Sequence, residues 1–581
     1  MSGDHMEIME ILEGLDIHNP NSYAQYAKME WRWKDDSNNN NYNSSNTLPS
    51  ANTATSFPQI NQIIKMDTKD IMTYWVGYKQ AFWYIPLTYT IGGTVAGNVF
   101  SAPAIGAFNT TPTAVVAIKN GLYQLVHALI VSINGQQLNK LQSNYINMAN
   151  HIHALIEASV DWALSIGVFA GFRKDTLETL LNPPASVANN LPYGASVYGA
   201  ISGQVYNTSY NQAGGNDATQ FYNIQIVNGN ATNLVATNGA TTAPALSANG
   251  ATGVNTMLLT QKNKNFNKGF FDRINFTNST YAVTSGVGRG EFNACIPLRI
   301  IHDFFRQLSI PLLGTQFYLQ LTMASPSLSA TQPLMVDTSV SGLTGGRSIA
   351  ETLSLTVGNS NLSNTRLYYP EITFNDETKA KVTALLEHGF QREVTWLDNY
   401  VIQGNQNTST SIGVAGITGY PTSTTTAVNF VVSPGLSRVQ RVILATPRAG
   451  GISSAYYADP CFSYAQYTNM QLLVDTKPLF PQLLQYDFEN YNLLKEEFIG
   501  HGRDPQDGSL ISYDEFISNN RFYCFNCSRM VNNLPDPSKE VSLSFLGQRV
   551  SGDTVPVDQY FIVEVEVNTV INFGNGKVKI I

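Results

Sequence analysis

Three pairs of residues have the chemical types and spacing to support catalysis or metal binding. They are Cys524-x-x-Cys527, His151-x-His153 and His302-Asp303. A CxxC motif can act in redox chemistry or supply two zinc ligands. Two neighbouring histidines can bind a metal ion, and a histidine beside an aspartate can form part of a catalytic dyad. Each of these functions needs further residues at suitable spacings.

Those further residues are missing from the sequence pattern. The remaining cysteines, Cys295 and Cys461, lie far from the CxxC motif and form no second pair. The segment Arg521–Met530 has the pattern of a strand, whereas a thioredoxin-like motif needs a βαβ setting. No third ligand accompanies the two histidines, and no Gly-x-Ser-x-Gly elbow supplies a nucleophile for His302. We therefore expect no catalytic residue, metal site or cofactor, with Asp303 beginning a helical turn and the cysteines buried in a strand.

Two glycine-rich segments resemble phosphate-binding loops. They are Gly286-Val-Gly-Arg-Gly290 and Gly574-Asn-Gly-Lys577. Neither has the full spacing of a nucleotide-binding motif followed by a helix. We expect both to be turns.

The composition indicates a large folded protein with a polar but nearly uncharged surface. Of the 581 residues, 43% are hydrophobic and only 13% are charged, and the formal net charge is −8. A chain of this length fits two all-β domains. No segment collects the Lys and Arg needed to bind nucleic acid through its phosphates, so direct sequence-specific binding to nucleic acid is not expected. A low charge density suits surfaces that pack against other copies of the chain or that face the outside.

One segment pattern occurs twice. Leu129–Leu138 and Leu472–Leu479 each contain an apolar strand, a polar turn and then a leucine. In this register Ile133 corresponds to Val474, and the turns are Asn134-Gly135 and Asp475-Thr476. Both turns are typical of β-hairpins. The match predicts a duplicated β-domain with the two hairpins in equivalent places.

The remaining signals divide the chain into four regions. We expect an N-terminal arm with an Asn-rich linker at 1–74, a first β-domain at 75–330, a linker at 331–365 and a second β-domain at 366–581. The arm would become ordered against another surface or stay disordered. The first domain includes a long loop region at 179–261, which holds one charged residue, Asp217. A second, charge-free stretch is Asn399–Ser437.

Several elements are predicted within these regions. We expect a strand ending at Pro297, a helical turn carrying Phe304 and Phe305, and a strand that alternates from Phe317 to Met323. Helices are expected at His151–Leu164 and at Asp376–His388. The alternation in Gln559–Val567 predicts a half-exposed strand. Helical patterns are otherwise scarce, so the fold class is all-β.

Three segments together resemble the major capsid proteins that have a double jelly-roll fold. They are Val131–Leu138 with Tyr145–Met148, then Ile296–Leu312, and Leu472–Pro481. The segment Ile296–Leu312 is most similar to the one that closes the first jelly roll in Polinton-like viruses and virophages. Asn134 stands where the family has a first glycine, and asparagine tolerates the same left-handed turn.

The resemblance implies two eight-stranded antiparallel jelly-roll sandwiches side by side, with long outer loops and a few short helices. It implies a structural protein, not an enzyme, in the capsid shell of an icosahedral double-stranded DNA virus, assembled inside the host cell. Its partners would be two further copies in a homotrimeric, pseudo-hexagonal capsomer, neighbouring capsomers, and penton and minor capsid or cement proteins. Whether such a shell contacts an internal membrane stays open.

A different class of function is also compatible with the composition. The aromatic and Asn-rich loops could belong to a secreted or surface β-sandwich protein that binds carbohydrate. A glycan-processing enzyme would need paired carboxylates, which the charge-poor loops almost lack. The start of the chain has no pattern of a signal peptide, which favours the capsid interpretation.

Overall fold

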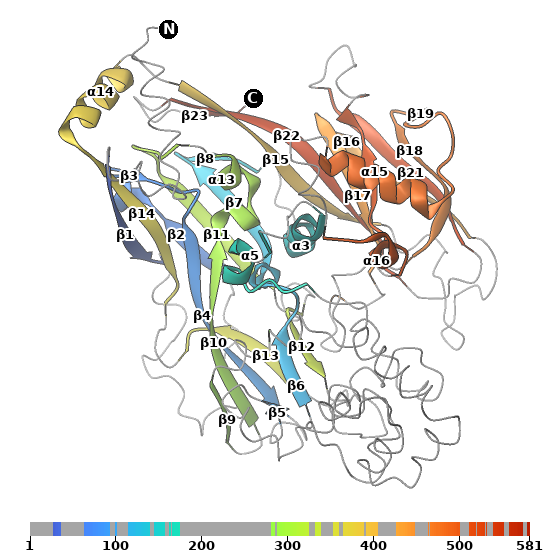
Figure 1. Ribbon diagram of the computed structural model, residues 1–581, viewed down its shortest axis with the longest axis horizontal. Coiled ribbons are helices and arrows are strands. Elements are labelled where there is room, and N and C mark those ends of the chain that lie inside the picture. Colours follow the sequence, from blue (N-terminus) through green and yellow to red (C-terminus); the bar gives the residue numbers. More distant parts are fainter. Residues whose placement is uncertain are drawn as a thin grey trace, which may run out of the picture.

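The structure is a computed structural model of the chain (Figure 1). It describes residues 27–36, 63–92, 99–100, 114–139, 144–156, 162–163, 165–174, 273, 280–284, 287–308, 310–324, 332–337, 352–359, 364–387, 391–404, 426–447, 452, 463, 465–499, 510–518, 520–528, 530, 539–550, 557–572 and 578–580. The predicted loop region at 179–261, Cys461 and the segment Gly574–Lys577 lie outside these residues.

The first sandwich is built from two main antiparallel sheets. One has the order β1-β14-β4-β10-β9, and the other has the order β2-β11-β7-β8. The strands of the first sheet are β1 (Ala27–Asp35), β14 (Arg366–Phe374), β4 (Phe82–Gly92), β10 (Val287–Pro297) and β9 (Thr280–Thr284), with β3 (Trp75–Val76) beside β14 and β13 (Thr352–Val357) beside β4. Those of the second are β2 (Ile63–Asp67), β11 (Phe317–Met323), β7 (Val126–Ile133) and β8 (Gln136–Gln137). A small sheet adds β12 (Leu334–Asp337), β6 (Ala114–Ile118) and β5 (Val99–Phe100).

The second sandwich repeats this arrangement. Its sheets have the orders β15-β22-β17-β20, with β23 beside β22, and β16-β21-β18-β19. The strands are β15 (Gln391–Gln403), β22 (Tyr560–Asn572), β17 (Val439–Ala445), β20 (Tyr523–Asn526), β23 (Val578–Ile580), β16 (Thr426–Leu436), β21 (Val541–Arg549), β18 (Tyr467–Val474) and β19 (Lys477–Pro478). Phe545 of β21 packs against Phe561 of β22, with ring centroids 5.6 Å apart, so the two sheets share one core.

Chain order and sheet order together define the topology. The main strands in chain order are β1, β2, β4, β7, β8, β10, β11 and β14 in the first sandwich, and β15 to β22 in the second. In both sandwiches the first of these strands lies beside the last one, and the third and sixth follow them in the same sheet. The second, seventh, fourth and fifth strands form the other sheet in that order. This is the strand order of a jelly roll, and it occurs twice. The predicted fold class, an all-β double jelly roll, is confirmed.

The two predicted hairpins occupy equivalent places. Ile133 ends β7 and Val474 ends β18, and these strands hold the same position in their sheets. Both turns have two residues with positive φ, at 48° and 82° for Asn134-Gly135 and at 49° and 69° for Asp475-Thr476. Such a turn matches the twist of the strands that it joins. The predicted correspondence of Ile133 with Val474 is therefore confirmed.

The first sandwich extends beyond its predicted boundaries. β1 lies in the region expected to be an arm, yet it pairs with β14 along its whole length, from Ala27↔Phe374 to Asp35↔Arg366. β14 in turn pairs with β4, although it lies in the region assigned to the second domain. The expected linker contains β12 and β13, which pair with β6 and β4. The limits at 74, 331 and 366 thus do not coincide with the limits of the sheets.

Short helices fill the space around the sheets. They are η2 (Lys69–Ile71), η5 (Leu122–Leu125), α3 (Ile146–Ile156), α5 (Ile166–Phe169), α12 (Leu298–Ile301), α13 (Asp303–Gln307), α14 (Asp376–Glu387), α15 (Asp487–Ile499) and α16 (Tyr513–Ser518). The prediction of α14 is accurate, while α3 begins and ends earlier than the predicted helix at 151–164. Within the described part of the chain, no helix is long and apolar enough to cross a membrane.

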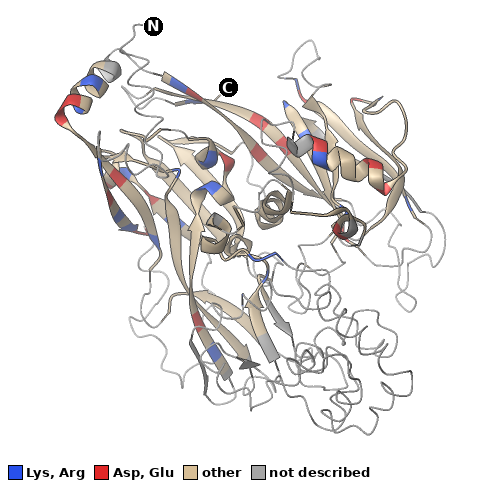
Figure 2. Cartoon of the chain, in the orientation of Figure 1, with Lys and Arg blue, Asp and Glu red and all other residues tan. Residues whose placement is uncertain are grey.

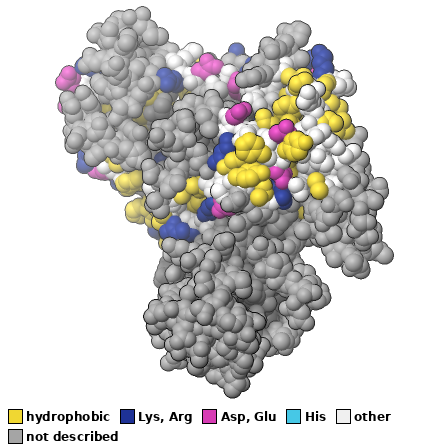
Figure 3. Space-filling view, turned by 45° about the vertical axis from the view of Figure 1, so that its right-hand side comes forward, with side chains coloured by type: hydrophobic (Ala, Val, Ile, Leu, Met, Phe, Trp, Pro, Cys, Tyr) yellow, Lys and Arg dark blue, Asp and Glu magenta, His cyan; other side chains and the backbone are white. Residues whose placement is uncertain are grey.

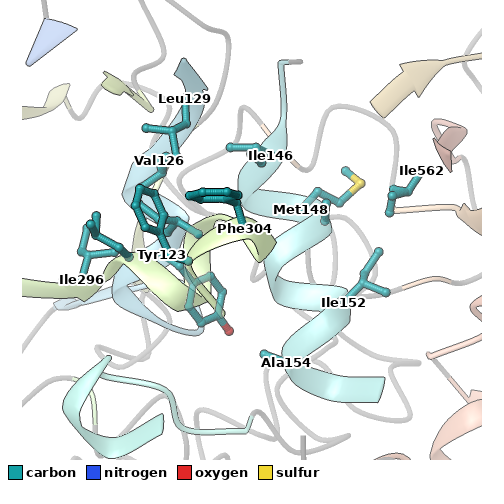
Figure 4. Close-up of a cluster of buried hydrophobic side chains, with 14 of the residues drawn as sticks. Tyr123, Val126, Leu129, Ile146, Met148, Ile152, Ala154, Ile296, Phe304 and Ile562 are labelled. Carbon is teal, nitrogen blue, oxygen red and sulfur yellow. The ribbon is translucent and has the colours of Figure 1, made fainter. Parts of the chain in front are cut away.

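One predicted strand is more buried than its pattern indicates. β22 was expected to be half exposed, but every residue from Tyr560 to Val565 is buried, Glu564 included. One face of β22 packs in the core of the second sandwich. Its other face is covered by α3 of the first sandwich, because Met148 and Ile152 extend toward Ile562 (Figure 4). The expectation was wrong because the second layer comes from a distant part of the chain.

Candidate functional site

The two sandwiches meet along strand β15, which lies at the edge of its sheet (Figure 1). Asp303 begins α13 in the first sandwich, and its Oδ2 accepts a hydrogen bond of 2.8 Å from the Leu397 main-chain N–H. This bond satisfies a donor of the edge strand that would otherwise face outward. The aspartate of the candidate dyad thus joins two domains, and its predicted position at the start of a helical turn is confirmed.

A polar cluster lies on one side of β15. The Asn139 side-chain amide donates to Asp398 Oδ1 over 3.2 Å, and its oxygen accepts from the Val131 main-chain N–H over 3.1 Å. The Tyr400 hydroxyl donates to Asp398 Oδ2 over 2.7 Å. Asn139, Asp398 and Tyr400 are all buried. These bonds compensate for the loss of water around a buried carboxylate.

His302 belongs to the same cluster. Its Nε2 lies 3.1 Å from Asn139 Nδ2, and its Nδ1 lies 3.3 Å from the Phe304 main-chain nitrogen. Both neighbours are N–H donors, so a doubly protonated ring would face donors on both sides. Burial lowers the pKa of His302 to about 4, although Asp303 acts in the opposite direction. The ring is therefore neutral at pH 7 and packs against Trp396, with ring centroids 4.8 Å apart.

A second polar cluster lies between α3 and the face of β22. Glu564 is completely buried and forms an ion pair with Arg441, and its Oε1 lies 2.9 Å from His153 Nε2. His153 Nε2 also lies 3.4 Å from Asn399 Oδ1 on β15. Arg441 and Glu564 are neighbours in the sheet register. The cluster therefore ties one helix of the first sandwich to three strands of the second.

His151 and His153 point to different surroundings. His151 Nδ1 lies 2.8 Å from the Tyr123 hydroxyl, inside the first sandwich, whereas His153 reaches the second sandwich. The two rings therefore do not converge on one metal ion. Among the described residues no group of three or more His, Cys, Asp and Glu side chains could hold one.

The cysteines of the CxxC motif lie in or beside β20, as predicted. Cys524 and Cys527 are both buried, and Cys527 Sγ lies 3.7 Å from the Phe525 carbonyl oxygen. Cys295 lies on β10, where burial raises the pKa of its thiol to about 11. A thiol with a raised pKa is a poor nucleophile.

The described part of the first glycine-rich segment, from Val287 to Gly290, is a strand and not the predicted turn. Gly288 and Gly290 lie within β10, and Gly290 pairs with Tyr89 of β4. The Tyr89 ring covers Gly290 so closely that a Cβ atom there would lie 2.2 Å from it. The glycine is required by this close approach.

Two mainly aromatic surfaces lie on opposite sandwiches and are at least partly exposed. The first, which we call the β1 face, lies on β1, β14 and β4 and consists of Trp31, Trp33, Phe82, Tyr84 and Tyr368. Trp31 and Trp33 are 46% and 55% exposed. The second, which we call the α15 face, consists of Leu483, Tyr486, Phe488, Tyr491 and Tyr513 on and around α15 and α16. Tyr486 and Phe488 are 66% and 59% exposed.

Charged groups are sparse over the sheets (Figure 2). Hydrophobic side chains gather on the surface of the second sandwich, with carboxylates among them (Figure 3). Large exposed aromatic residues that cluster together are typical of surfaces that bind other proteins. The geometry of the described residues thus points to association between proteins.

Sequence comparison gives no match, since no protein-family model fits the chain and no curated protein is similar to it. Comparison of structures gives clear matches. A chain in the cryo-EM structure of the Sputnik virophage is 10% identical, with a TM-score of 0.50, and the match covers 95% of this chain and 88% of that one. The mavirus major capsid protein is also 10% identical, with a TM-score of 0.43, and the match covers 95% and 90% of the two chains. The chain thus shares its double jelly-roll fold, along nearly its whole length, with a chain of the Sputnik virophage.

Proposed function

We propose that the protein is the major capsid protein of an icosahedral double-stranded DNA virus. The observation that carries this proposal is the double jelly roll in one chain, matched over 95% of its length by a chain of the Sputnik virophage structure. The exposed aromatic surfaces support it, because a structural subunit needs contact areas more than a reactive centre. The protein would lie in the capsid shell of the virion.

Each chain would supply two of six positions in a homotrimeric, pseudo-hexagonal capsomer. The junction along β15 supports this, since it fixes the two sandwiches side by side through a hydrogen bond, the contact of His153 with the Glu564 carboxylate, and buried rings. A rigid pair of similar domains is suited to a closed ring of three chains. We propose that the contacts between chains are permanent and that each buries more than about 2,000 Å².

Further partners follow from the same proposal. They are neighbouring capsomers and the penton and minor capsid or cement proteins. The segment 179–261 would form outer loops and take part in contacts between subunits, because a surface of many uncharged residues is more stable when partly covered.

The oligomeric state and assembly of the pure protein test the proposal. We expect size-exclusion chromatography with light scattering to give a mass of three chains, and electron microscopy to show pseudo-hexagonal particles. A monomer that binds glycans on an array would contradict the capsid role and support the carbohydrate-binding alternative. A trimer that never associates further at high protein concentration, with or without the other virion proteins, would contradict the role in a shell.

A further inference from the structure

Two surfaces take part in the contact between the sandwiches of one chain, and the equivalent surface on each opposite sandwich has no such contact within the described chain. Within one chain, residues of the first sandwich contact and hydrogen-bond the edge strand β15 of the second sandwich. The equivalent edge strand of the first sandwich is β1, since β1-β14-β4 and β15-β22-β17 hold the same places in their sheets. β1 carries the exposed Trp31 and Trp33.

The helices that follow the two hairpins are equivalent as well. α3 begins at Ile146 and α15 begins at Asp487, and each follows its hairpin at the same spacing. α3 is almost completely buried, because β15 and β22 of the second sandwich cover it. α15 keeps an exposed side that includes Phe488. The same structural position is thus covered in one sandwich and open in the other.

One pair of tyrosines illustrates the difference. Tyr145 precedes α3 and packs against Tyr560 at the start of β22, with ring centroids 5.4 Å apart. Tyr486 precedes α15 at the corresponding place and is 66% exposed. The strand equivalent to β22 is β14, which begins at Arg366 beside Trp33.

The β1 face lies on the outer side of its sheet. Leu367 and Trp83 are register partners and point into the core with no exposure. Tyr368 is the register partner of both Phe82 and Trp33, so these three rings lie on the opposite side. Phe82 and Tyr368 stack with centroids 5.1 Å apart. This is the side that, in the second sandwich, α3 covers.

We propose that the α15 face of one chain packs on the β1 face of a second copy, in the same manner as α3 packs on β15 and β22 within the chain. The occupant of both faces is then another copy, and the contact is heterologous.

This assignment rests on the proposed capsomer and adds the residues that would hold it together. Because the contact between chains repeats the contact within them, three chains place six sandwiches in one ring with a single type of junction. Each contact needs one α15 face and one β1 face, so loss of either face should prevent closure of the ring of three chains.

Two double variants test the assignment. Trp31→Ala with Trp33→Ala removes the β1 face, and Tyr486→Ala with Phe488→Ala removes the α15 face without touching β1. Val431→Ala is the matched control, because Val431 is 70% exposed and lies on neither face. Circular dichroism and thermal unfolding verify that each variant folds.

We expect each double variant to weaken trimer formation by about 100-fold or more in sedimentation experiments, as for truncation of central aromatic residues in other interfaces. The control should form trimers like the wild type. An equimolar mixture of the two double variants should give dimers at high concentration and no trimers, since only one functional contact remains.

The outcomes distinguish a failure of this inference from a failure of the proposed trimeric capsomer. A trimeric wild type whose two variants stay trimeric with unchanged affinity would overturn the assignment of the faces and leave the capsomer in place. A mixture of variants that restores trimers would also overturn it. A wild type that is monomeric at all concentrations would overturn both proposals.

Discussion

Asn134 and Asp475 make the same hydrogen bond in different sandwiches. Asn134 Oδ1 accepts from the Gln316 main-chain N–H over 2.7 Å, and Asp475 Oδ1 accepts from the Ser542 main-chain N–H over the same distance. In both cases the donor precedes, or lies at the start of, the strand that pairs with the hairpin. The side chain at the first turn position therefore connects each hairpin to its neighbour in the sheet.

The second turn position differs between the sandwiches and gives a reciprocal prediction. Thr476 has φ of 69° and Gly135 has φ of 82°, and both are exposed. A β-branched residue is strained at positive φ, whereas glycine is not. We expect Thr476→Gly to raise the free energy of unfolding by about 1 kcal/mol and Gly135→Thr to lower it by a similar amount. Chemical denaturation measures both, and equal signs would contradict the strain at Thr476.

The buried carboxylate of Glu564 should be essential to the junction. Glu564→Ala leaves Arg441 buried without its main partner, so we expect a loss of about 3–5 kcal/mol in stability. The double variant Arg441→Met with Glu564→Leu should recover most of this loss, because no buried charge remains uncompensated. Glu377→Ala removes an exposed ion pair with Lys381 on α14 and should change stability by less than about 0.5 kcal/mol. A Glu564→Ala variant as stable as that control would contradict the prediction.

The buried rings of His302 and His127 should make the protein less stable at mildly acidic pH. Burial lowers the pKa of each ring to about 4, compared with about 6.5 in an unfolded chain. The unfolded chain therefore binds a proton between pH 6.5 and 4 and the folded chain does not, so stability is full above pH 6.5 and declines as the pH falls. We expect each histidine to lower the free energy of unfolding by about 2–3 kcal/mol at pH 4 compared with pH 7.

Unfolding measured at a series of pH values, with His302→Gln and His127→Phe as variants, checks this prediction. The difference between wild type and variant isolates each histidine from the carboxylates that titrate in the same range. A difference that stays constant from pH 7 to pH 4 would show that the ring does not resist protonation.

Deletion of β1 should damage the first sandwich. Its nine residues pair with β14, and Asp36 Oδ2 accepts bonds from the main chain and hydroxyl of Thr365. A chain that lacks residues 1–36 should lose several kcal/mol of stability, on the order of the largest single-site effects. A chain that lacks only residues 1–26 serves as the control. Equal melting temperatures for the two truncations would contradict a structural role for β1.

Local patterns in the sequence predict much of the fold. The two hairpins, β11 and α14 follow from residues that are close together in the chain. β1 could have been recognised from the alternation of Met29, Trp31 and Trp33, but its partner β14 is more than 300 residues away, and pairing over that distance leaves no local signal. The burial of β22 was mispredicted for the same reason, since α3 comes from the other sandwich.

The junction could not be predicted from motifs. His153, Arg441 and Glu564 are far apart in the sequence and form no recognisable spacing. His302-Asp303 stood out as a possible catalytic pair, yet both residues contact β15 and so join the two sandwiches. A buried charged residue in an apolar strand, such as Glu564 between Val563 and Val565, is the one signal that could have indicated a distant partner.

The pairing of β1 with β14 determines when the first sandwich can be completed on the ribosome. β1 is made near the beginning of the chain, and its partner emerges more than 300 residues later. At 5–20 residues per second, β1 must wait roughly 15–70 s with its tryptophans and its strand edge open to wrong pairing. In the second sandwich the edge strand β15 also waits for its partner β22, but the paired residues follow by only 157–181 positions, from Gln403↔Tyr560 to Gln391↔Asn572, so the delay is about half as long. Nascent chains are therefore exposed to aggregation, and dependent on chaperones, for longest between the synthesis of β1 and that of β14.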